Sequence, residues 1–510
     1  MGGPAQIPLI PLYSGRQIRE AEAPLLQGGQ REMLMRRAAY GLAQVVLERI
    51  REARGRVYGA TVTGLIGSGN NGGDGLHALA MLRRRGVETH AVLLRDRAHE
   101  SGLKAFRAAG GKIVEVVDTD SDALIDAIIG TGSRVGFELP RIPGLDEVLA
   151  QESTQVVACD IPSGVDVETG AVAGDVIEAD VTVTFGGIKS GLALGAGSHA
   201  AGAIRAVDIG LGVNLPTPER WLVGDERLRA TTPDAESTLG PLSRPRVSAR
   251  DHKYSRGVLH VISGSVQYPG AAQLTATAAV ASGVGMVTLQ APEEVRERLS
   301  IMMPEVVTTS GKSAAVLERA TAAAIGPGIA RDVFQIAAMG RALEWAGTQH
   351  PCILDASALA NLDEVYFEDG SLGANVLLTP HAGELRRIMG NTGHDDLLEV
   401  LEKDPAAAVE QLAARLRVTV LLKGPSTVIA APDGPTVVHR VHAPGLATAG
   451  SGDVLTGIIG ALAAVDPQAP MWRTATLGVR LHADAARRID PHGCGSFGAG
   501  ELLEAVGPLQ

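Results

Sequence analysis

Residues 445–457 (GLATAGSGDVLTG) place glycine, serine and aspartate directly before an apolar, helix-compatible run, residues 454–464. Four of these thirteen residues are glycine. Glycine lets a backbone approach a ligand closely, and the dipole of a helix attracts anions to its N-terminus. The segment therefore predicts an anion site at the start of a helix, with Asp453 in the first helical turn.

A carboxylate at such a site has two interpretations. Asp453 beside a bound phosphate is well placed to act as a general base, which takes a proton from a hydroxyl group that attacks the phosphoryl group. Alternatively, Asp453 is only an acidic residue that interacts favourably with the helix dipole.

Four further turn clusters in the second half of the chain follow apolar, strand-like runs. They are residues 268–272 after 258–262, 326–328 after 322–325, 379–384 after 376–378, and 423–427 after 418–422. In an open α/β sheet, ligands bind beyond the carboxyl ends of the strands. We therefore expect these clusters to meet at one edge of a sheet, where they form a ligand site.

In this order, the clusters resemble those of the ADP/ATP-dependent NAD(P)H-hydrate dehydratases, a branch of the ribokinase-like fold, over roughly residues 225–510. The resemblance implies that Asp453 is the base and that residues 450–452 supply oxyanion donors. It implies a hydrate pocket lined by Ala272, Gly328, His381 and Asp453. The phosphates of ADP, which carries Mg²⁺, would be held by Lys423, Gly424, Pro425, Ser426, Thr427 and Gly452. His381 has a second interpretation, as a neutral histidine that structures its own Pro/Gly turn.

The first half of the chain alternates between helical and strand-like segments. Helices are expected over residues 31–54 and 75–85. Strands are expected at residues 57–66, 87–94, 112–116, 124–129, 155–159, 181–185 and 204–207. This alternation predicts a mostly parallel sheet covered on both faces. Residues 213–250 are rich in Pro, Arg, Thr and Ser without clear periodicity, so we place a domain boundary between residues 221 and 222.

A second dense cluster, residues 67–75 (GSGNNGGDG), follows the strand expected at residues 57–66 and precedes a helix. It contains the pattern G-x-G-x-x-G, but the amide and carboxylate side chains inside it differ from a dinucleotide-binding fingerprint. So many glycine, asparagine and aspartate residues together favour a ligand pocket over a structural loop.

Two more strand ends carry oxygen-bearing side chains. Asp126 is embedded in an apolar run that ends in the turn of residues 130–132, and Asp160 and Ser163 follow the strand expected at residues 155–159. A buried carboxylate needs a partner, and a cation is one candidate. Asn71, Asp126 and Ser163 offer hard oxygen ligands that suit an alkali or alkaline-earth ion. The alternative is that Asp126 and Asp160 only cap the turns that follow them.

These three motifs resemble the NAD(P)H-hydrate epimerase domain over roughly residues 12–212. The resemblance implies that Asp160 handles protons at the hydrated ring and that Asn71, Asp126 and Ser163 bind a potassium ion. The remaining implied substrate contacts are Asn70, Asn71, Gly72, Gly73, Asp74, Gly130, Thr131, Gly132, Ser133, Arg134, Val135 and Gly136. A non-catalytic nucleotide- or RNA-binding module is the alternative for this half.

Together, the two halves resemble the fused bacterial bifunctional NAD(P)H-hydrate repair enzymes. The implied fold is α/β, with two three-layer α/β/α domains, an N-terminal Rossmann-like domain with a mostly parallel sheet and a C-terminal ribokinase-like domain. The implied activity is epimerisation of the R and S hydrates at C6, followed by dehydration of the S epimer to NAD(P)H with ADP, which yields AMP and phosphate. A conventional small-molecule kinase is the alternative for the C-terminal half.

The sequence departs from the family pattern at three positions, Ser68, Ser357 and Ala449. Ser68 stands where the family usually has proline, Ser357 where a second aspartate is common, and Ala449 where glycine is common. At Ser357 the chain therefore lacks a carboxylate that could coordinate a metal ion or water near Asp355. The preference for ADP over ATP follows from the fused layout and not from a particular residue.

Composition restricts the remaining possibilities. A net charge of −11 argues against non-specific binding to nucleic acid or anionic membranes. Only seven of the 46 basic residues are lysines, so Lys189 and Lys423 draw attention within apolar sequence. The three cysteines have no paired spacing, which fits a reduced cytoplasmic setting without a metal cluster. Residues 257–292 lack charged side chains, but polar and turn residues interrupt them too often for a membrane span. The sequence leaves open whether the chain forms a homo-oligomer.

Overall fold

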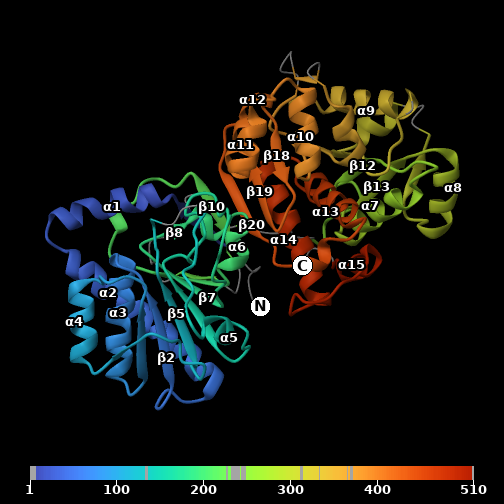
Figure 1. The fold of residues 1–510 in the computed structure, drawn as a ribbon. Coiled ribbons are helices and arrows are strands. Elements are labelled where there is room, and N and C mark those ends of the chain that lie inside the picture. The colour runs from blue at the N-terminus through green and yellow to red at the C-terminus, as the bar shows by residue number, and fades with distance from the viewer. Residues whose placement is uncertain are drawn as a thin grey trace. The chain divides into compact units, whose positions relative to one another are not determined.

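The computed structural model describes residues 7–132, 136–224, 228–230, 242, 248–310, 314–331, 333–363, 366–367 and 372–507. The chain forms two compact units, which we call the N-terminal unit (Ile10–Thr238) and the C-terminal unit (Met1–Leu9 with Leu239–Gln510). Figure 1 shows the helices and strands of both. The division falls inside the predicted boundary segment, residues 213–250, and the boundary between residues 221 and 222 stays a prediction.

The N-terminal unit is built on a sheet with the strand order β11-β9-β7-β6-β5-β2-β3-β4. All its neighbouring strands are parallel. The strands are β2 (Thr61–Ile66), β3 (Glu88–Leu93), β4 (Lys112–Val114), β5 (Ala123–Ala127), β6 (Gln155–Cys159), β7 (Val181–Phe185), β9 (Ala203–Val207) and β11 (Leu228–Ala230). Outside this sheet, β1 (Leu9–Tyr13) pairs in parallel with β8 (Ile188–Lys189), and β10 (Arg220–Val223) lies next to β1.

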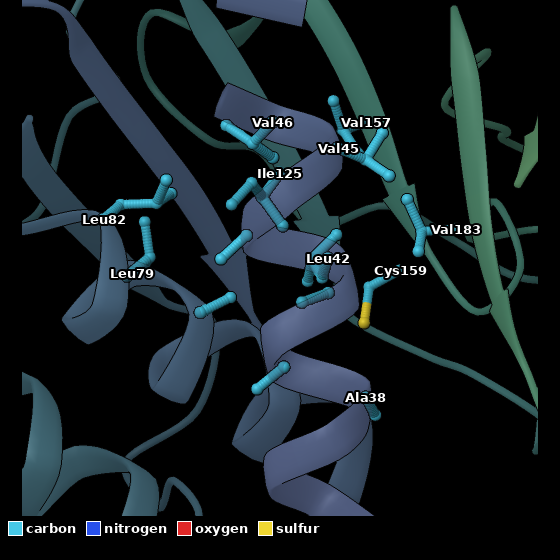
Figure 2. Close-up of a cluster of buried hydrophobic side chains, with 14 of the residues drawn as sticks. Ala38, Leu42, Val45, Val46, Leu79, Leu82, Ile125, Val157, Cys159 and Val183 are labelled. Atoms are coloured by element: carbon cyan, nitrogen blue, oxygen red, sulfur yellow. The ribbon is translucent and has the colours of Figure 1, made fainter. Parts of the chain in front are cut away.

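Helices cover both faces of this sheet. The helices of this unit are α1 (Gly15–Gln27), α2 (Arg31–Arg54), α3 (Asn70–Arg83), α4 (Glu100–Ala108), α5 (Leu145–Leu149) and α6 (Gly197–Ala200). On one face, Leu42 of α2 packs in a cluster with Leu79 of α3 and with Ile125, Val157 and Val183 from the sheet (Figure 2). The opposite face uses the alternate strand positions, which form a second cluster with α5. Parallel strands buried on both faces explain why they read as continuous apolar runs.

The C-terminal unit contains a sheet with the strand order β14-β13-β12-β15-β16-β17-β18-β19-β20. Its strands are parallel from β14 to β18, and β18, β19 and β20 form an antiparallel meander. The strands are β12 (Val258–Ile262), β13 (Met286–Gln290), β14 (Val307–Thr309), β15 (Ala322–Ile325), β16 (Cys352–Leu354), β17 (Val376–Leu378), β18 (Thr419–Leu422), β19 (Ser426–Ala430) and β20 (Thr436–Arg440).

A central helix, α13 (Ser451–Val465), positions the site of this unit. Its residues from Val454 to Ala464 are buried, and it packs against α7 (Pro269–Ala281), α14 (Met471–Ile489) and strands β12, β15 and β16. Glycine makes this close packing possible, since a Cβ at Gly457 would lie 2.3 Å from the carbonyl oxygen of Thr275. The other helices are α8 (Glu293–Met302), α9 (Val333–Ala346), α10 (Ala382–Asn391), α11 (Leu397–Lys403), α12 (Pro405–Leu416) and α15 (Ala499–Ala505).

The structure confirms the predicted α/β class with parallel sheets and most of the predicted elements. Two of the predicted boundaries were wrong in an informative way. The helix expected at residues 75–85 begins at Asn70, so residues 70–74 form its first turns and not a loop. The strand expected from residue 57 begins only at Thr61. Among the described residues, no helix combines the length and the apolar character needed to cross a membrane.

Candidate active sites

The candidate site of the N-terminal unit lies where β2, β5, β6 and β7 end side by side. The turn of residues 67–69 leads from β2 into α3, and residues 128–132 follow β5. Asp160 directly follows β6, and Lys189 lies in β8 shortly after β7. Parallel strands thus bring the three predicted motifs to one edge of the sheet, as the sequence indicated.

Three glycines hold the turns at this edge in close contact. A Cβ at Gly67 would lie 2.0 Å from the carbonyl oxygen of Ile128, and a Cβ at Gly72 would lie 2.0 Å from that of Gly67. A Cβ at Gly130 would lie 3.0 Å from Asn71 Oδ1 and 3.2 Å from Asp160 Oδ2. The Asn71 amide and the Asp160 carboxylate therefore both border Gly130, and a larger residue there would enter the space between them.

Asp160 has a backbone conformation that L-amino acids rarely adopt, with φ +69°. Its Oδ1 accepts hydrogen bonds from the buried ammonium group of Lys189, from Thr184 Oγ1 at 3.4 Å and from the Phe185 amide at 3.4 Å. None of these donors belongs to the turn that follows Asp160. The interpretation of Asp160 as a simple turn cap is therefore wrong.

Asp126 is fully buried and is bound mainly by Ser163. Ser163 Oγ donates to Asp126 Oδ1 at 2.6 Å, and the Ser163 amide donates to Asp126 Oδ2 at 2.7 Å. The Ile128 amide, in the following turn, adds a bond of 3.3 Å. Burial raises the pKa of Asp126 to about 6, although these hydrogen bonds oppose the shift.

Three predicted oxygen ligands at this edge of the sheet are chemically suited to an alkali ion. The set comprises a carboxylate, the Ser163 hydroxyl and the side-chain amide oxygen of Asn71. Asn71 Nδ2 is buried without a hydrogen-bond partner among the described residues, so the structure does not fix this amide in place. These donors fit the potassium ion that the sequence predicts, because carboxylate, hydroxyl and amide oxygens are hard ligands.

Two further carboxylates lie near Asp160. Burial, followed by the charges of Asp160 and Glu22, raises the pKa of Asp74 well above its ordinary value, and Lys189 opposes this. Burial also raises the pKa of Glu22 in α1. Asp74 Oδ1 is buried without a hydrogen-bond partner among the described residues, as expected for an oxygen atom that awaits a ligand.

The turn after β5 is only partly described. Arg19 Nη1 donates to the Thr131 carbonyl oxygen at 2.9 Å, which ties this turn to α1. Gly132 follows it at the surface, and Gly136 has a φ of +85°. The predicted contacts Ser133, Arg134 and Val135 lie outside the described residues.

The candidate site of the C-terminal unit lies at the start of α13. Gly450, with a φ of +88°, precedes the helix, and Asp453 lies in its first turn, as predicted. A Cβ at Gly452 would lie 3.4 Å from Lys423 Nζ and 3.7 Å from Asp355 Oδ2. The helix N-terminus, a lysine and a buried carboxylate therefore converge on one point.

Lys423 links the strand ends of this site. Its ammonium group donates to Asp355 Oδ1 at 2.7 Å and lies 3.9 Å from Glu384 Oε2. Thr456 Oγ1, one turn further along α13, donates to Asp355 Oδ2 at 2.8 Å. The Lys423 amide also donates to the Pro380 carbonyl oxygen at 2.8 Å. The lysine side chain is 22% exposed, whereas that of Asp355 is 2% exposed, so the lysine is the more accessible of the two.

The surroundings of Asp453 raise its pKa to about 7. Burial is the largest cause, the charge of Asp355 adds to it, and the charge of Lys423 opposes it. A carboxyl group that titrates near neutral pH is suited to general base catalysis, because it accepts a proton more strongly than an ordinary carboxylate.

His381 caps helix α10. Its Nδ1 accepts hydrogen bonds from the amides of Gly383 at 3.0 Å and Glu384 at 3.3 Å. Glu384 Oε2 in turn accepts from the His381 amide at 2.9 Å, which completes a capping box. The structural interpretation of His381 is therefore confirmed. Its ring proton is on Nε2, and because the side chain is 57% exposed, the ligand role stays open as well.

Two predicted pocket residues lie near the start of α7. A Cβ at Gly328, which has a φ of +65°, would lie 2.6 Å from Ala271 Cβ and 2.8 Å from the Tyr268 carbonyl oxygen. Gly328 thus allows the turn after β15 to touch α7. Ala272 is fully buried, and its Cβ faces Gly264.

The predicted nucleotide segment forms the turn between β18 and β19. Lys423, Gly424 and Pro425 precede β19, which begins at Ser426. Thr427 Oγ1 donates to the Gly424 carbonyl oxygen at 3.1 Å, and this bond holds the turn closed. Ser426 Oγ is buried without a hydrogen-bond partner among the described residues.

Several residues at the two sites received no role from the sequence. They are Asp355, Glu384 and Thr456 at the C-terminal site and Lys189, Thr184 and Glu22 at the N-terminal site. Asp355 gave a usable signal, since it directly follows the apolar strand β16. Lys189 gave another, as a rare lysine next to apolar sequence. Glu22 gave no such signal, because the sequence of a surface helix does not show which edge of the sheet its side chains will face.

Comparison with known proteins gives matches to both halves of the chain. Residues 259–504 match the family described as NAD(P)H-hydrate dehydratase, and residues 31–191 match the family described as YjeF-related protein N-terminus. The bifunctional NAD(P)H-hydrate repair enzyme of Mycobacterium leprae is 39% identical over 475 residues, which are 93% of each chain. That of Mycobacterium tuberculosis is 40% identical over 453 residues, 89% of each chain. A solved structure of the ADP/ATP-dependent NAD(P)H-hydrate dehydratase from Bacillus subtilis, co-crystallized with ATP and Mg²⁺, is 30% identical with a TM-score of 0.44; the match covers 52% of this chain and 92% of that one.

Proposed function

Because this chain belongs to the family of bifunctional NAD(P)H-hydrate repair enzymes, we propose that its N-terminal unit epimerises NAD(P)H hydrates and its C-terminal unit dehydrates the S epimer. The substrate is a reduced nicotinamide cofactor to which water has added across the C5–C6 double bond, which leaves a hydroxyl group at C6. ADP is consumed in the dehydration, and NAD(P)H, AMP and phosphate are released.

The dehydration has two chemical steps. The C6 hydroxyl group first loses its proton to a base and attacks the β-phosphoryl group of ADP, with AMP as the leaving group. Elimination of the resulting phosphate, together with a proton from C5, then restores the ring double bond. We assign the base role to Asp453, because its carboxyl group titrates near neutral pH and lies in the first turn of α13. This placement of Asp453 is the observation that supports the proposal most strongly.

The N-terminal amides of α13 and Lys423 are suited to hold the charge of the transferring phosphoryl group. Gly452 leaves room for a phosphate oxygen beside Lys423 Nζ, since even a Cβ there would lie 3.4 Å from that nitrogen. Gly424, Pro425, Ser426 and Thr427 would hold the rest of the nucleotide. His381 and the backbone near Gly328 and Ala272 would line the hydrate pocket.

Mg²⁺ would enter this site with the nucleotide. Asp355 and Glu384 fit this ion chemically, because carboxylate oxygens are its preferred protein ligands and both residues lie around Lys423. When bound, the ion would neutralise part of the charge of the diphosphate. Ser357 lies half-buried in the turn after Asp355, and its carbonyl oxygen accepts from Asn361 Nδ2 at 2.7 Å.

At the N-terminal site, we assign the proton transfer to Asp160. The C6 hydroxyl group lies on the carbon next to the ring nitrogen. Transfer of its proton to Asp160 lets a C6=O bond form as the C6–N1 bond breaks and N1 takes up a proton. The reverse steps on the other face of the carbonyl close the ring as the other epimer. Asn70, Gly72, Gly73, Asp74, Gly130, Thr131, Gly132 and Gly136 would surround the hydrate, together with Ser133, Arg134 and Val135. A potassium ion at Asn71, Asp126 and Ser163 would supply a fixed positive charge that favours anionic groups of the substrate.

One assay tests both activities. The purified chain is mixed with NADH hydrate, with and without ADP, and the absorbance of reduced nicotinamide is followed. We expect the absorbance to return only with ADP, together with the release of inorganic phosphate. Complete conversion of an R/S mixture, faster than spontaneous epimerisation allows, would support the epimerase. A stable phosphorylated product would instead indicate a conventional kinase. We further place this activity in the cytoplasm, where nicotinamide cofactors turn over.

A further inference from the structure

Lys189 is a deeply buried basic side chain at the N-terminal site, with 1% of its side chain exposed. It lies at the end of β8, close to the carboxyl end of β7. A lysine in the interior is unfavourable unless its charge is paired and its hydrogen atoms are bonded. A lysine buried here must therefore have its charge paired and its N–H groups bonded within the protein.

Each of the three N–H groups of the Lys189 ammonium has an acceptor in the protein. It donates to Asp160 Oδ1, to Thr184 Oγ1 at 3.1 Å and to the Phe185 carbonyl oxygen at 2.9 Å. All three of its hydrogen atoms are thus used within the protein. Lys189 is therefore unable to donate to a substrate without first giving up one of these bonds.

The two oxygen atoms of Asp160 have different surroundings. Oδ1 receives Lys189, Thr184 and the Phe185 amide. Oδ2 has no hydrogen bond to a described residue and lies on the side of Gly130, where a Cβ would be 3.2 Å away. One oxygen atom is thus anchored, and the other faces the turn that we assign to the hydrated ring.

We propose that Lys189 is a positioning residue for epimerisation, which anchors Oδ1 of the Asp160 carboxylate and so turns its Oδ2 toward the substrate. This inference rests on the proposed epimerase function. Lys189 acts only through Asp160: the proton from the C6 hydroxyl group passes to Asp160 Oδ2 and returns from it, and the ammonium group keeps its own protons throughout.

The neighbouring charges explain why a cation is needed at this place. Asp74 from α3 and Glu22 from α1 are carboxylates whose interaction with Asp160 disfavours simultaneous ionisation. Lys189 opposes this effect at both Asp74 and Glu22. Arg19, the other basic group near Glu22, is bonded to the Thr131 carbonyl oxygen. The charge that Asp160 carries is thus balanced by Lys189.

A double-mutant cycle on the full chain tests the inference. The variants are Lys189→Met, Asp160→Asn and the double variant, assayed for R/S interconversion without ADP. We expect Lys189→Met to lower kcat by ~10²-fold or more with little change in KM, because the base is displaced while the substrate contacts remain. In the Asp160→Asn background, we expect Lys189→Met to cause no further loss, since Lys189 has no role apart from Asp160.

The double variant also guards against failure to fold, because it removes the buried cation together with its counter-ion. Thr184→Val is the matched control, which removes one hydrogen bond of Lys189 but leaves both charges, and we expect it to lose less than ~10-fold. Full activity of Lys189→Met, or equal losses from Lys189→Met in the two backgrounds, would overturn the inference. Absence of interconversion in the wild-type protein would instead overturn the proposed epimerase function.

Discussion

The ammonium group of Lys423 lies 2.7 Å from Asp355 Oδ1, although the two residues are 68 positions apart in the chain. The pair sits beside Asp453, and its two charges act on that carboxyl group in opposite directions. Asp355 raises the pKa of Asp453, and Lys423 lowers it. Substitution of either Asp355 or Lys423 should therefore change the pKa of Asp453.

We expect Asp355→Asn and Lys423→Met to move the pH dependence of dehydration in opposite directions. Removal of the Asp355 charge lowers the pKa of Asp453, so the rate should rise at a lower pH than in the wild type. Removal of the Lys423 charge raises that pKa, so the rate should rise at a higher pH. The measurement is kcat/KM for ADP-dependent dehydration across neutral pH. Shifts in the same direction would contradict the electrostatic assignment.

Asp453→Asn should remove dehydration and leave ADP binding largely intact. We expect a loss of at least ~10²-fold in kcat, the usual scale for a positioned general base. The nucleotide phosphates should still be held by the amides of α13 and by Lys423. Epimerisation by the same protein serves as the internal control. A fully active Asp453→Asn protein would leave only the helix-dipole interpretation.

The same substitution should change stability in a way that depends on pH. The pKa of Asp453 is raised to about 7 in the folded state, so ionisation of this group between pH 3.8 and about 7 destabilises the fold. Above pH 7, Asp453→Asn should therefore be more stable than the wild type, by at most about 4 kcal/mol. Below pH 4 the difference should vanish. Unfolding by urea at several pH values measures it, and a less stable variant at pH 8 would contradict the raised pKa.

Asp160→Asn should reduce the rate of R/S interconversion by ~10²–10⁴-fold, because an amide cannot accept the proton. The measurement is interconversion without ADP, after subtraction of the spontaneous rate. The substitution also leaves the Lys189 ammonium without its counter-ion, so we expect a loss of up to about 3 kcal/mol in stability. ADP-dependent dehydration of the S epimer should be retained, and interconversion at the wild-type rate would contradict the assignment.

Three buried histidines should make the C-terminal unit sensitive to acid. Burial lowers the pKa of His260 to about 4, of His439 to about 3 and of His482 to about 4. Between pH 6.5 and about 4, the unfolded chain binds protons that the folded chain does not, so stability falls as pH falls through this window. His482→Gln keeps a donor for the Ser451 carbonyl oxygen and should reduce the loss by up to about 3 kcal/mol at pH 4. Equal acid sensitivity of the two proteins would contradict the lowered pKa of His482.

The two units should function separately. We expect a fragment of residues 239–510 to fold and to dehydrate one epimer with ADP, because the helix, lysine and carboxylates of that site all belong to the C-terminal unit. A fragment that starts at Trp221 is the matched control for the predicted boundary. If both fragments fold but neither is active while the full chain is, the two sites depend on each other.

Local sequence patterns were sufficient to predict several strands together with their ends. β6, β7, β12, β15 and β17 have the bounds that their apolar runs indicated. A buried parallel strand needs an apolar side chain on both faces, so its limits are visible in the sequence. The turns that follow such strands were equally visible, which is why Asp160 and Lys423 could be chosen as candidates.

The start of α3 and the pairing of charges were not predictable in this way. Glycine normally disfavours a helix interior, so residues 70–74 read as a loop. Their place in the helix follows from packing, because a Cβ at Gly75 would lie 2.6 Å from Ala127 Cβ in β5. Likewise, the contact of Lys189 with Asp160 depends on where the chain places β8 after the end of β7, relative to the end of β6. No local pattern encodes such a distance.

The close contact of the Gly67 and Gly72 backbones with their neighbours has a thermodynamic consequence. Glycine-rich segments are commonly flexible, but here glycine is present because no side chain would fit between the turns after β2 and β5. A segment wedged in this way has little conformational freedom to lose when a ligand arrives. Binding of the hydrate should therefore carry only a small ordering penalty, and more of the contact energy remains as affinity. The glycines at this edge therefore allow close packing of the backbone and do not make it mobile.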